Sequence, residues 1–225
     1  MRYRTAIVTG ASRGLGLAVG RVFAERGLNV MLASRTQPDD ALPWTRLDVA
    51  DPASVEALFA ATRERFGPVD VLVNNAGVGH GKPFEDFTVE ELRETLDVNL
   101  LGPMLCALAA LPDMLEAGRG LIVNVGSDLS RRFLAGMTPY TASKFGLLGF
   151  SGSLLREVKD RGVKVTAVLP GIIDTGFGGF APEGSRGERD GMPAEQLALQ
   201  IAWLLDQPEH VVIDELTMHP LTQTF

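Results

Sequence analysis

Tyr140 and Lys144 are the two residues whose types and spacing most directly suggest chemistry. They lie four positions apart on a predicted helix, so their side chains share one face of that helix. A phenol can deliver a proton to an oxygen that gains negative charge, although its ordinary pKa of about 10 suits neutral pH poorly. A neighbouring ammonium favours the tyrosinate and would lower that pKa. The pair predicts acid–base chemistry, and an ordinary helical pair is the alternative.

Ser127 adds a hydroxyl group 13 residues before Tyr140, directly after a predicted buried strand. A hydroxyl at that point can hydrogen-bond the oxygen of a substrate and orient it. Losing such a donor typically costs about 2.7–4 kcal/mol of transition-state stabilisation. We therefore expect Ser127 to act together with Tyr140.

Asn99 lies within a long predicted helix, and Pro103 follows it by four positions. Proline has no N–H, so the Asn99 carbonyl loses its helical donor and the helix should kink there. The freed carbonyl is available for another partner. The alternative is that Gly102 and Pro103 only bend the helix around the core.

A glycine-rich turn, Thr9-Gly-Ala-Ser-Arg-Gly-Leu-Gly16, stands where the first predicted strand meets the first predicted helix. Glycines let the backbone approach a phosphate, and the helix N-terminus favours its charge. The spacing Gly-x3-Gly-x-Gly differs from the general dinucleotide fingerprint, so a tight turn without a ligand remains the alternative. The residues expected to contact a cofactor here are Gly10, Ser12, Arg13, Gly14, Leu15 and Gly16.

The end of the second predicted strand indicates which dinucleotide would bind. An NAD site has an acidic residue about 20 residues after the glycines, which holds the ribose 2′-hydroxyl. Here the strand ends in Ser34 and Arg35 instead. A hydroxyl and a guanidinium suit a 2′-phosphate, and Arg13 could close the same pocket. These residues favour NADP(H), and two solvated surface arginines are the alternative.

These residues must be positioned by a chain that alternates between short apolar runs and longer helical segments. Buried strands are predicted at Thr5–Thr9, Asn29–Ala33, Val69–Val73, Leu121–Val125, Val163–Leu169 and Val211–Leu216. Helices are predicted at Leu15–Arg26, Pro52–Phe66 (with Asp51 as N-cap), Thr88–Glu116, Thr141–Arg161 and Pro193–Asp206. The alternation predicts an α/β fold, a parallel sheet with helices on both faces. Ligands of such sheets bind at the carboxyl ends of the strands.

The composition excludes several other classes of protein. The 225 residues are 45% hydrophobic, enough for one sizeable core, and the net charge of −7 argues against a nucleic-acid partner. The lone Cys106 and three scattered histidines offer neither a disulfide framework nor a metal site. The longest uncharged run, Val98–Pro112, is shorter than the roughly 18 residues of a membrane helix. We expect one cytoplasmic domain over residues 1–225 without a membrane partner.

In chain order, several motifs resemble the short-chain dehydrogenase/reductase family and together span nearly the whole chain. They are Thr9–Gly16, Leu47–Val49, Asn74–Gly77, Asn99, Ser127, Tyr140–Lys144 and Pro170–Thr175. The resemblance implies a Rossmann-type doubly wound sheet of about seven strands and NAD(P)-dependent oxidation or reduction. The chain looks most similar to 3-oxoacyl-(acyl-carrier-protein) reductases and NADP-dependent 3-hydroxy acid dehydrogenases.

The resemblance also implies roles for individual residues. Asn99, Ser127, Tyr140 and Lys144 match the catalytic positions: the Asn99 carbonyl would hold a water in a proton relay to Lys144, and Lys144 would also bond the nicotinamide ribose. The remaining cofactor positions are Asp48 and Val49 at the adenine, Asn75, Ala76 and Gly77 behind the adenosine ribose, and Pro170, Gly171, Ile173 and Thr175 at the nicotinamide. Asn74–Gly77 could equally be a structural element.

Three features depart from the family pattern. Asp128 directly follows Ser127, and Arg131 and Arg132 come soon after, either to read a substrate carboxylate or carrier protein or as a salt-bridged surface loop. The glycine-rich segment 176–191, with Phe177 and Phe180, is expected to form a mobile substrate lid. The C-terminal tail lacks a glycine-rich ending and looks more like that of the hydroxy acid dehydrogenases, and His219 within it is interpreted as structural.

The sequence therefore predicts an NADP(H)-dependent oxidoreductase that interconverts a ketone or aldehyde, such as a 3-oxo acid or acyl group, with an alcohol. Two alternatives remain: a catalytically silent NADP(H)-binding sensor or interaction protein on the same fold, and an NAD-linked alcohol dehydrogenase. By analogy with the family, wide apolar helix faces that include Leu108 and Phe145 predict a homodimer or homotetramer.

Overall fold

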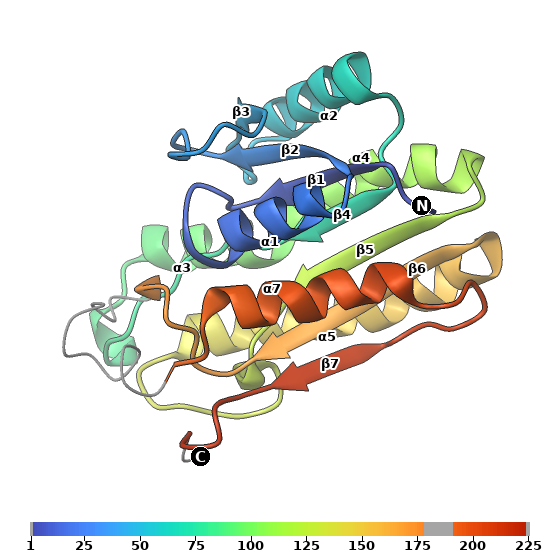
Figure 1. The fold of residues 1–225 in the computed structure, drawn as a ribbon. Helices are drawn as coiled ribbons and strands as arrows, with labels where there is room; N and C mark the ends of the chain where they lie inside the picture. The colour runs from blue at the N-terminus through green and yellow to red at the C-terminus, as the bar shows by residue number, and fades with distance from the viewer. Residues whose placement is uncertain (1, 178–190, 224–225) are drawn as a thin grey trace.

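The sheet has seven parallel strands in the order β3-β2-β1-β4-β5-β6-β7 (Figure 1). A computed structural model describes residues 2–177 and 191–223 of the chain. The strands are β1 (Thr5–Thr9), β2 (Asn29–Ser34), β3 (Trp44–Arg46), β4 (Val71–Asn74), β5 (Gly120–Val125), β6 (Val163–Pro170) and β7 (Glu215–Met218). β1 pairs with both β2 and β4, so the strand order reverses beside β1. The chain thus has a Rossmann-like α/β fold.

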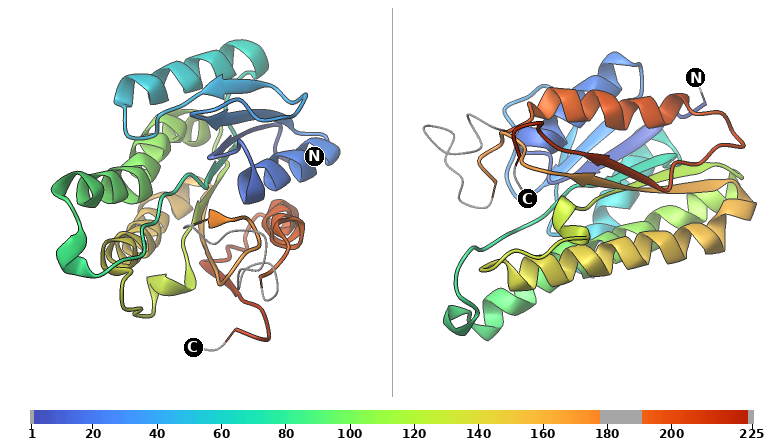
Figure 2. Two further views of the ribbon diagram at one scale, coloured as in Figure 1. Left: turned by 90° about the vertical axis from the view of Figure 1, so that its left-hand side faces the viewer. Right: turned by 90° about the horizontal axis from the view of Figure 1, so that it is seen from below.

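Helices cover both faces of this sheet, as the end-on view in Figure 2 shows. One face carries α1 (Gly14–Glu25) and α7 (Ala194–Trp203), and the other carries α2 (Pro52–Phe66), α4 (Gly102–Glu116) and α5 (Thr138–Val158). Each layer has its own apolar core, because alternate strand residues such as Val8 and Ile7 face opposite helices. The near-continuous apolar strands are therefore buried on both sides, as a parallel sheet requires.

The remaining described elements are short. They are η1 (Phe84–Asp86), α3 (Val89–Leu96), η2 (Asp97–Leu101), η3 (Asp128–Ser130), η4 (Lys159–Arg161) and η6 (Leu204–Asp206). Side chains begin two helices as expected from their types: the Asp51 carboxylate accepts from Ala53 N–H before α2, and Thr88 and Glu91 form a capping box before α3.

The structure differs most from the predicted elements at three places. β3 was not predicted, because its three residues are too few for a periodic signal and are only partly buried. β7 starts at Glu215 rather than Val211. It is an edge strand that pairs only with β6, and its residues are only partly buried, so its apolar pattern does not define where it begins. The predicted helix over residues 88–116 is interrupted by the π-helical turn η2, which places the irregularity where Pro103 removes a helical N–H.

The stretch Val89–Glu116 is the one described segment long and apolar enough to span a membrane by length and composition, because an 18-residue window within it has a mean hydropathy of 1.6. That window is longer than the uncharged run Val98–Pro112 because it admits up to two charged residues. Its helices pack against α2, α5 and the strands β4 and β5. We therefore assign it to the core of the α/β fold.

Candidate active site

A cavity of about 1160 Å³ lies at the carboxyl ends of the strands and extends across the point where the strand order reverses. Its volume exceeds the roughly 300–1,000 Å³ of sites for a single small ligand. Of the residues predicted from the sequence, those that line it are Gly10, Ser12, Arg13, Gly14, Leu15, Ser34, Arg35, Asp48, Val49, Asn75, Ala76, Gly77, Ser127, Tyr140, Lys144, Pro170, Gly171, Ile173 and Thr175. Folding thus brings segments from most of the chain to one cavity.

The turn after β1 has the geometry of a phosphate cradle. Gly10 and Gly14 have φ angles of 64° and 57°, in the region that favours glycine. Helix α1 follows without a side-chain cap, so its first N–H groups, at the cavity-lining residues Gly14 and Leu15, are available to an anion. This uncapped helix start, with glycines beside it, fits the pyrophosphate of a dinucleotide.

Asn75 holds that turn against β4. Its Nδ2 donates to the carbonyls of Thr9 (3.0 Å) and Gly10 (3.2 Å), and the Thr9 hydroxyl accepts from Asn75 N–H and Ala76 N–H in return. Both amide hydrogens of Asn75 are therefore used within the fold. The Asn74–Gly77 segment thus has the structural role that the sequence left open, besides lining the cavity.

Gly16 is the one predicted cofactor residue that does not line the cavity. A Cβ atom at this position would lie 2.5 Å from Asn75 Nδ2 and 2.6 Å from the Gly10 carbonyl oxygen. Gly16 is buried because the helix must approach the turn closely at this point. The structure thus shows a packing role for Gly16 at this close approach.

The two predicted arginines and Ser34 differ in what they offer a ligand. Arg13 is exposed at the start of α1, and the Arg35 side chain is 66% exposed, with its guanidinium 4.0 Å from the Glu94 carboxylate. The Ser34 hydroxyl instead donates to the Thr36 carbonyl (2.7 Å) and accepts from Trp44 Nε1 (3.0 Å). Its single proton is thus used inside the chain, which leaves the arginines as the groups able to bind a phosphate here.

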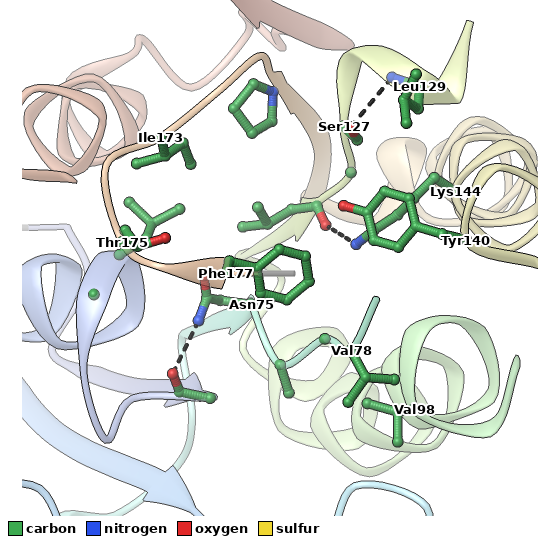
Figure 3. Close-up of a pocket in the computed structure, with 18 of the residues that line it drawn as sticks. Asn75, Val78, Val98, Ser127, Leu129, Tyr140, Lys144, Ile173, Thr175 and Phe177 are labelled. Carbon is green, nitrogen blue, oxygen red and sulfur yellow. Dashed lines mark hydrogen bonds between the residues drawn. The ribbon is translucent and has the colours of Figure 1, made fainter. Parts of the chain in front are cut away.

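Ser127, Tyr140 and Lys144 lie together on one wall of the cavity (Figure 3). Ser127 follows β5, whereas Tyr140 and Lys144 project from the same face of α5. Lys144 Nζ donates to the Val125 carbonyl (2.8 Å) and lies 5.5 Å from the centre of the Tyr140 ring. Across the cavity, Ile173 and Thr175 follow β6 (Figure 3).

Burial shifts the pKa values of both Tyr140 and Lys144. It raises the pKa of Tyr140 to about 12, although a hydrogen bond with Ser127 lowers that pKa, and the Asp128 carboxylate raises it further. Burial also lowers the pKa of Lys144 to about 8. The net shift of the Tyr140 pKa in this structure is therefore upward and not the lowering expected from Lys144, because the loss of solvation is its largest cause. Tyr140 is a protonated phenol at neutral pH.

Asn99 lies behind this wall, fully buried and outside the cavity lining. Its Oδ1 accepts from Val78 N–H, and its Nδ2 donates to the Val78 carbonyl and to Ser143 Oγ, which in turn donates to the Tyr140 carbonyl. Both amide hydrogens are engaged, so the side chain ties the segment after β4 to α5. A relay through Asn99 would have to use its main-chain carbonyl.

The charged loop after Ser127 is partly a surface feature. Arg131 pairs with Glu215 on β7 (2.7 Å) and, like Arg132, lines the cavity. Phe177 lies beside Tyr140, with ring centres 6.0 Å apart. The predicted lid 176–191 lies outside the described residues apart from its two ends. Next to those ends, Ile173 and Met192 form an isolated bridge.

Several lining residues were not recognised in the sequence. Thr36, Gln37, Val78, Val98, Met137 and Gln223 carry no motif and reach the cavity only through the fold. Gln223 is the most distant in sequence, because it belongs to the tail after β7. Within residues 2–177 and 191–223, no three His, Cys, Asp or Glu side chains are placed to hold a metal ion.

Comparison with known proteins identifies the family of this α/β fold. The family model described as short chain dehydrogenase matches residues 4–184. An uncharacterized oxidoreductase of Staphylococcus aureus is 30% identical over 97% of both chains. The chain belongs to the short-chain dehydrogenase/reductase family and is an oxidoreductase of that family.

Two solved structures are similar over almost their whole length. An alcohol dehydrogenase from the archaeon Thermococcus sibiricus, complexed with 5-hydroxy-NADP, has a TM-score of 0.89 and 31% identity, over 98% of both chains. A closed form of serine dehydrogenase complexed with NADP⁺ has a TM-score of 0.90 and 30% identity, over 98% of this chain and 96% of that one. A nicotinamide cofactor and a small-molecule substrate are typical of the family.

Proposed function

We propose that this protein is an NADP(H)-dependent reductase that interconverts a ketone or aldehyde with an alcohol. The observation that carries the proposal is the continuous cavity. One end offers Arg13, Arg35 and the uncapped start of α1, and the other offers Ser127, Tyr140 and Lys144. The first set suits a phosphorylated nucleotide and the second suits proton transfer to a substrate oxygen, so the cavity could hold both reactants.

Named segments of the chain would hold the cofactor. The turn from Gly10 to Leu15 would bind the pyrophosphate, and Asp48 and Val49 would face the adenine. Asn75, Ala76 and Gly77 would border the adenosine ribose, while Pro170, Gly171, Ile173 and Thr175 would border the nicotinamide. The proposal is supported by the positions of these residues around the cavity and by the NADP-type ligands with which the two similar structures are complexed.

The chain's own residues would supply the proton and orient the substrate. When bound, the nicotinamide supplies a hydride to a carbonyl carbon, or accepts one from an alcohol. Tyr140 then gives its phenolic proton to the oxygen that becomes an alkoxide, and Ser127 orients that oxygen by a hydrogen bond. Because Tyr140 is protonated at neutral pH, the site is prepared for reduction. Lys144 would support the tyrosinate that remains, and the Asn99 carbonyl would connect it to solvent.

Titration of the purified protein with NADPH and NADH, followed by fluorescence, tests the cofactor. We expect NADPH to bind at least about tenfold more tightly, a difference of about 1.4 kcal/mol. Arg35→Ala and Arg13→Ala should each weaken NADPH binding about tenfold and change NADH binding little, because only NADPH carries the 2′-phosphate. Ser34→Ala should have a smaller effect than either, since its hydroxyl is bonded to Thr36 and Trp44.

The matched control is Arg46→Ala, which removes the same charge from an exposed position on β3 outside the cavity lining. Equal affinity for both cofactors would contradict the NADP(H) assignment and favour the NAD-linked alternative. Binding of NADPH without turnover in a screen of ketones, aldehydes and 3-oxo esters would favour a silent sensor instead.

We also infer a homodimer or homotetramer of single-domain chains in the cytoplasm. Leu108 on α4 is 70% exposed and Phe145 on α5 is 37% exposed, where it stacks on Phe133 at 5.4 Å between ring centres. Apolar side chains on two neighbouring helices suit an isologous contact. Sedimentation equilibrium should give the mass of two or four chains, and a monomer at micromolar concentration would contradict this inference.

A further inference from the structure

The tail after β7 returns to the carboxyl edge of the sheet and reaches the cavity. Gly171 N–H donates to the Met218 carbonyl (2.7 Å), and Gln223 N–H donates to the Pro220 carbonyl in a turn (3.0 Å). A Cβ atom at Gly171 would meet Gln223 Oε1 and the His219 Cβ atom, so the glycine leaves the space that the tail fills. Gln223 thereby becomes part of the cavity wall.

The side-chain amide of Gln223 bridges two loops of the site. Its Oε1 accepts from Ile172 N–H (2.9 Å), in the loop expected to border the nicotinamide. Its Nε2 donates to Asp128 Oδ2 at 2.6 Å, a short bond to a charged acceptor. Because the two ends of the amide differ chemically, this arrangement requires an N–H at Ile172 and an acceptor at Asp128.

Asp128 continues the chain of hydrogen bonds to Ser127. Asp128 Oδ1 accepts from Ser127 Oγ (3.1 Å), and Ser127 Oγ accepts from Leu129 N–H (3.2 Å). Ser127 also interacts with the phenol of Tyr140. The sequence Ile172–Gln223–Asp128–Ser127–Tyr140 is therefore continuous from the loop after β6 to the phenol.

We propose that Gln223 and Asp128 are positioning residues that complete the catalytic centre: Gln223 fixes the Asp128 carboxylate, and Asp128 holds Ser127 Oγ in place. The single Ser127 proton, which is donated to Asp128 here, turns to the substrate oxygen when Ser127 donates to it. The inference rests on the proposed function in assigning catalysis to Ser127 and Tyr140. It adds that the C-terminal tail, more than 80 residues beyond Tyr140, is part of the catalytic machinery. It also gives a reason for an aspartate directly after the serine, which is a departure from the family pattern.

A carboxylate at this place has an electrostatic consequence for Tyr140. Within the part of the chain that the structure describes, two charged groups face the phenol, Asp128 from η3 and Lys144 from α5, whereas its neighbours Ser127, Gly79 and Phe177 are uncharged. Of the cationic residues after Asp128, Arg131 is paired with Glu215, and Arg132 lies beside it on the cavity wall. Asp128 opposes formation of the tyrosinate and so favours the protonated acid that reduction needs.

Tyr140 can be titrated directly, because the chain contains only two tyrosines. In a Tyr3→Phe background, the near-ultraviolet absorbance of tyrosinate reports Tyr140 alone, and circular dichroism at each pH checks that the protein stays folded. Asp128→Asn should lower the Tyr140 pKa by about half a unit or more, because it removes a like charge. Asp160→Asn, at the distant η4, removes the same charge and should leave the titration unchanged.

Exchange of the carboxylate and the amide between positions 128 and 223 tests the hydrogen bond between Asp128 and Gln223. In Gln223→Glu, two carboxylates face each other, and kcat for reduction of ethyl acetoacetate by NADPH should fall about tenfold. In Asp128→Asn/Gln223→Glu, the amide introduced at position 128 can donate to the carboxylate introduced at position 223, which still accepts from Ile172 N–H. This double variant should recover to within about threefold of wild type. Thr222→Ala, at the neighbouring tail position, is the control and should resemble wild type.

The two readouts separate this inference from the proposed function. A wild-type protein that reduces no carbonyl compound would contradict the proposed function, while the absorbance titration would still decide the placement of Asp128. An unchanged or higher Tyr140 pKa in Asp128→Asn overturns the inference. The inference is also overturned if the loss of kcat in the double variant equals the product of the fold-losses measured for the two single variants.

Discussion

Tyr140→Phe should lower kcat for carbonyl reduction about 1000-fold, because the variant keeps the ring and loses only the proton donor. Tyr140 is buried, and Phe177 packs beside its ring, so phenylalanine can occupy the same space. The affinity for NADPH should change by less than about threefold, since the phosphate-binding groups lie on the other side of the cavity. Steady-state kinetics and a fluorescence titration of the same preparation give both values.

Tyr3→Phe is the matched control, because Tyr3 is the other tyrosine of the chain and is also buried, next to β1. It should retain wild-type turnover. If Tyr140→Phe kept more than about a tenth of wild-type kcat, another group would be delivering the proton and our assignment of the acid would be wrong.

Lys144→Met should abolish most turnover and at the same time stabilise the protein without cofactor. The Lys144 pKa is about 8 in the folded protein and 10.5 in a solvated lysine. Below pH 8, burial of the ammonium therefore lowers the free energy of unfolding by about 3 kcal/mol, and Lys144→Met removes this cost. The variant also loses the hydrogen bond to the Val125 carbonyl, which reduces its gain by about 1 kcal/mol. We expect a net stabilisation of about 2 kcal/mol at neutral pH.

The pH dependence of this gain gives it a distinct signature. Between pH 8 and 10.5 the unfolded wild-type chain binds the proton that folded Lys144 has released, so raising the pH stabilises the wild-type fold. The advantage of Lys144→Met is therefore greatest below pH 8 and is lost as the pH rises to 10.5. Urea unfolding at several pH values measures it. Lys159→Met, at the exposed η4, should give no such gain, and a pH-independent difference for Lys144→Met would refute the argument.

The sequence was sufficient to predict the α/β fold and the clustering of residues at one edge of the sheet. Fully buried strands such as β1 have a strong apolar signal, and α2 begins and ends where Asp51 and the helical spacing predicted. The apolar strand signal and the helix signals can be read from the sequence because each depends on residues that are close together in the chain. β3 and β7 were missed or misplaced because edge strands are short and only partly buried, and their pairing depends on the neighbouring strand.

The candidate site was less predictable in its details. Motif positions located the cavity, but they could not show that Gly16 serves packing or that the hydroxyl of Ser34 is already bonded. The direction of the Tyr140 pKa also depended on burial, which spacing along a helix does not reveal. Gln223 had no sequence signal, because its contact with Asp128 joins positions 95 residues apart.

The reversal of strand order beside β1 divides the molecule into two parts that can diverge separately. The residues proposed to choose between NADPH and NADH belong to the β1–β3 half, while Ser127, Tyr140 and Lys144 bond to groups on β5, η3 and α5. A change of cofactor preference therefore need not disturb the reacting group, and a new substrate need not alter the nucleotide. Such modularity would let this scaffold acquire new chemistry by drift in one half at a time, and it makes the two properties separate targets for engineering.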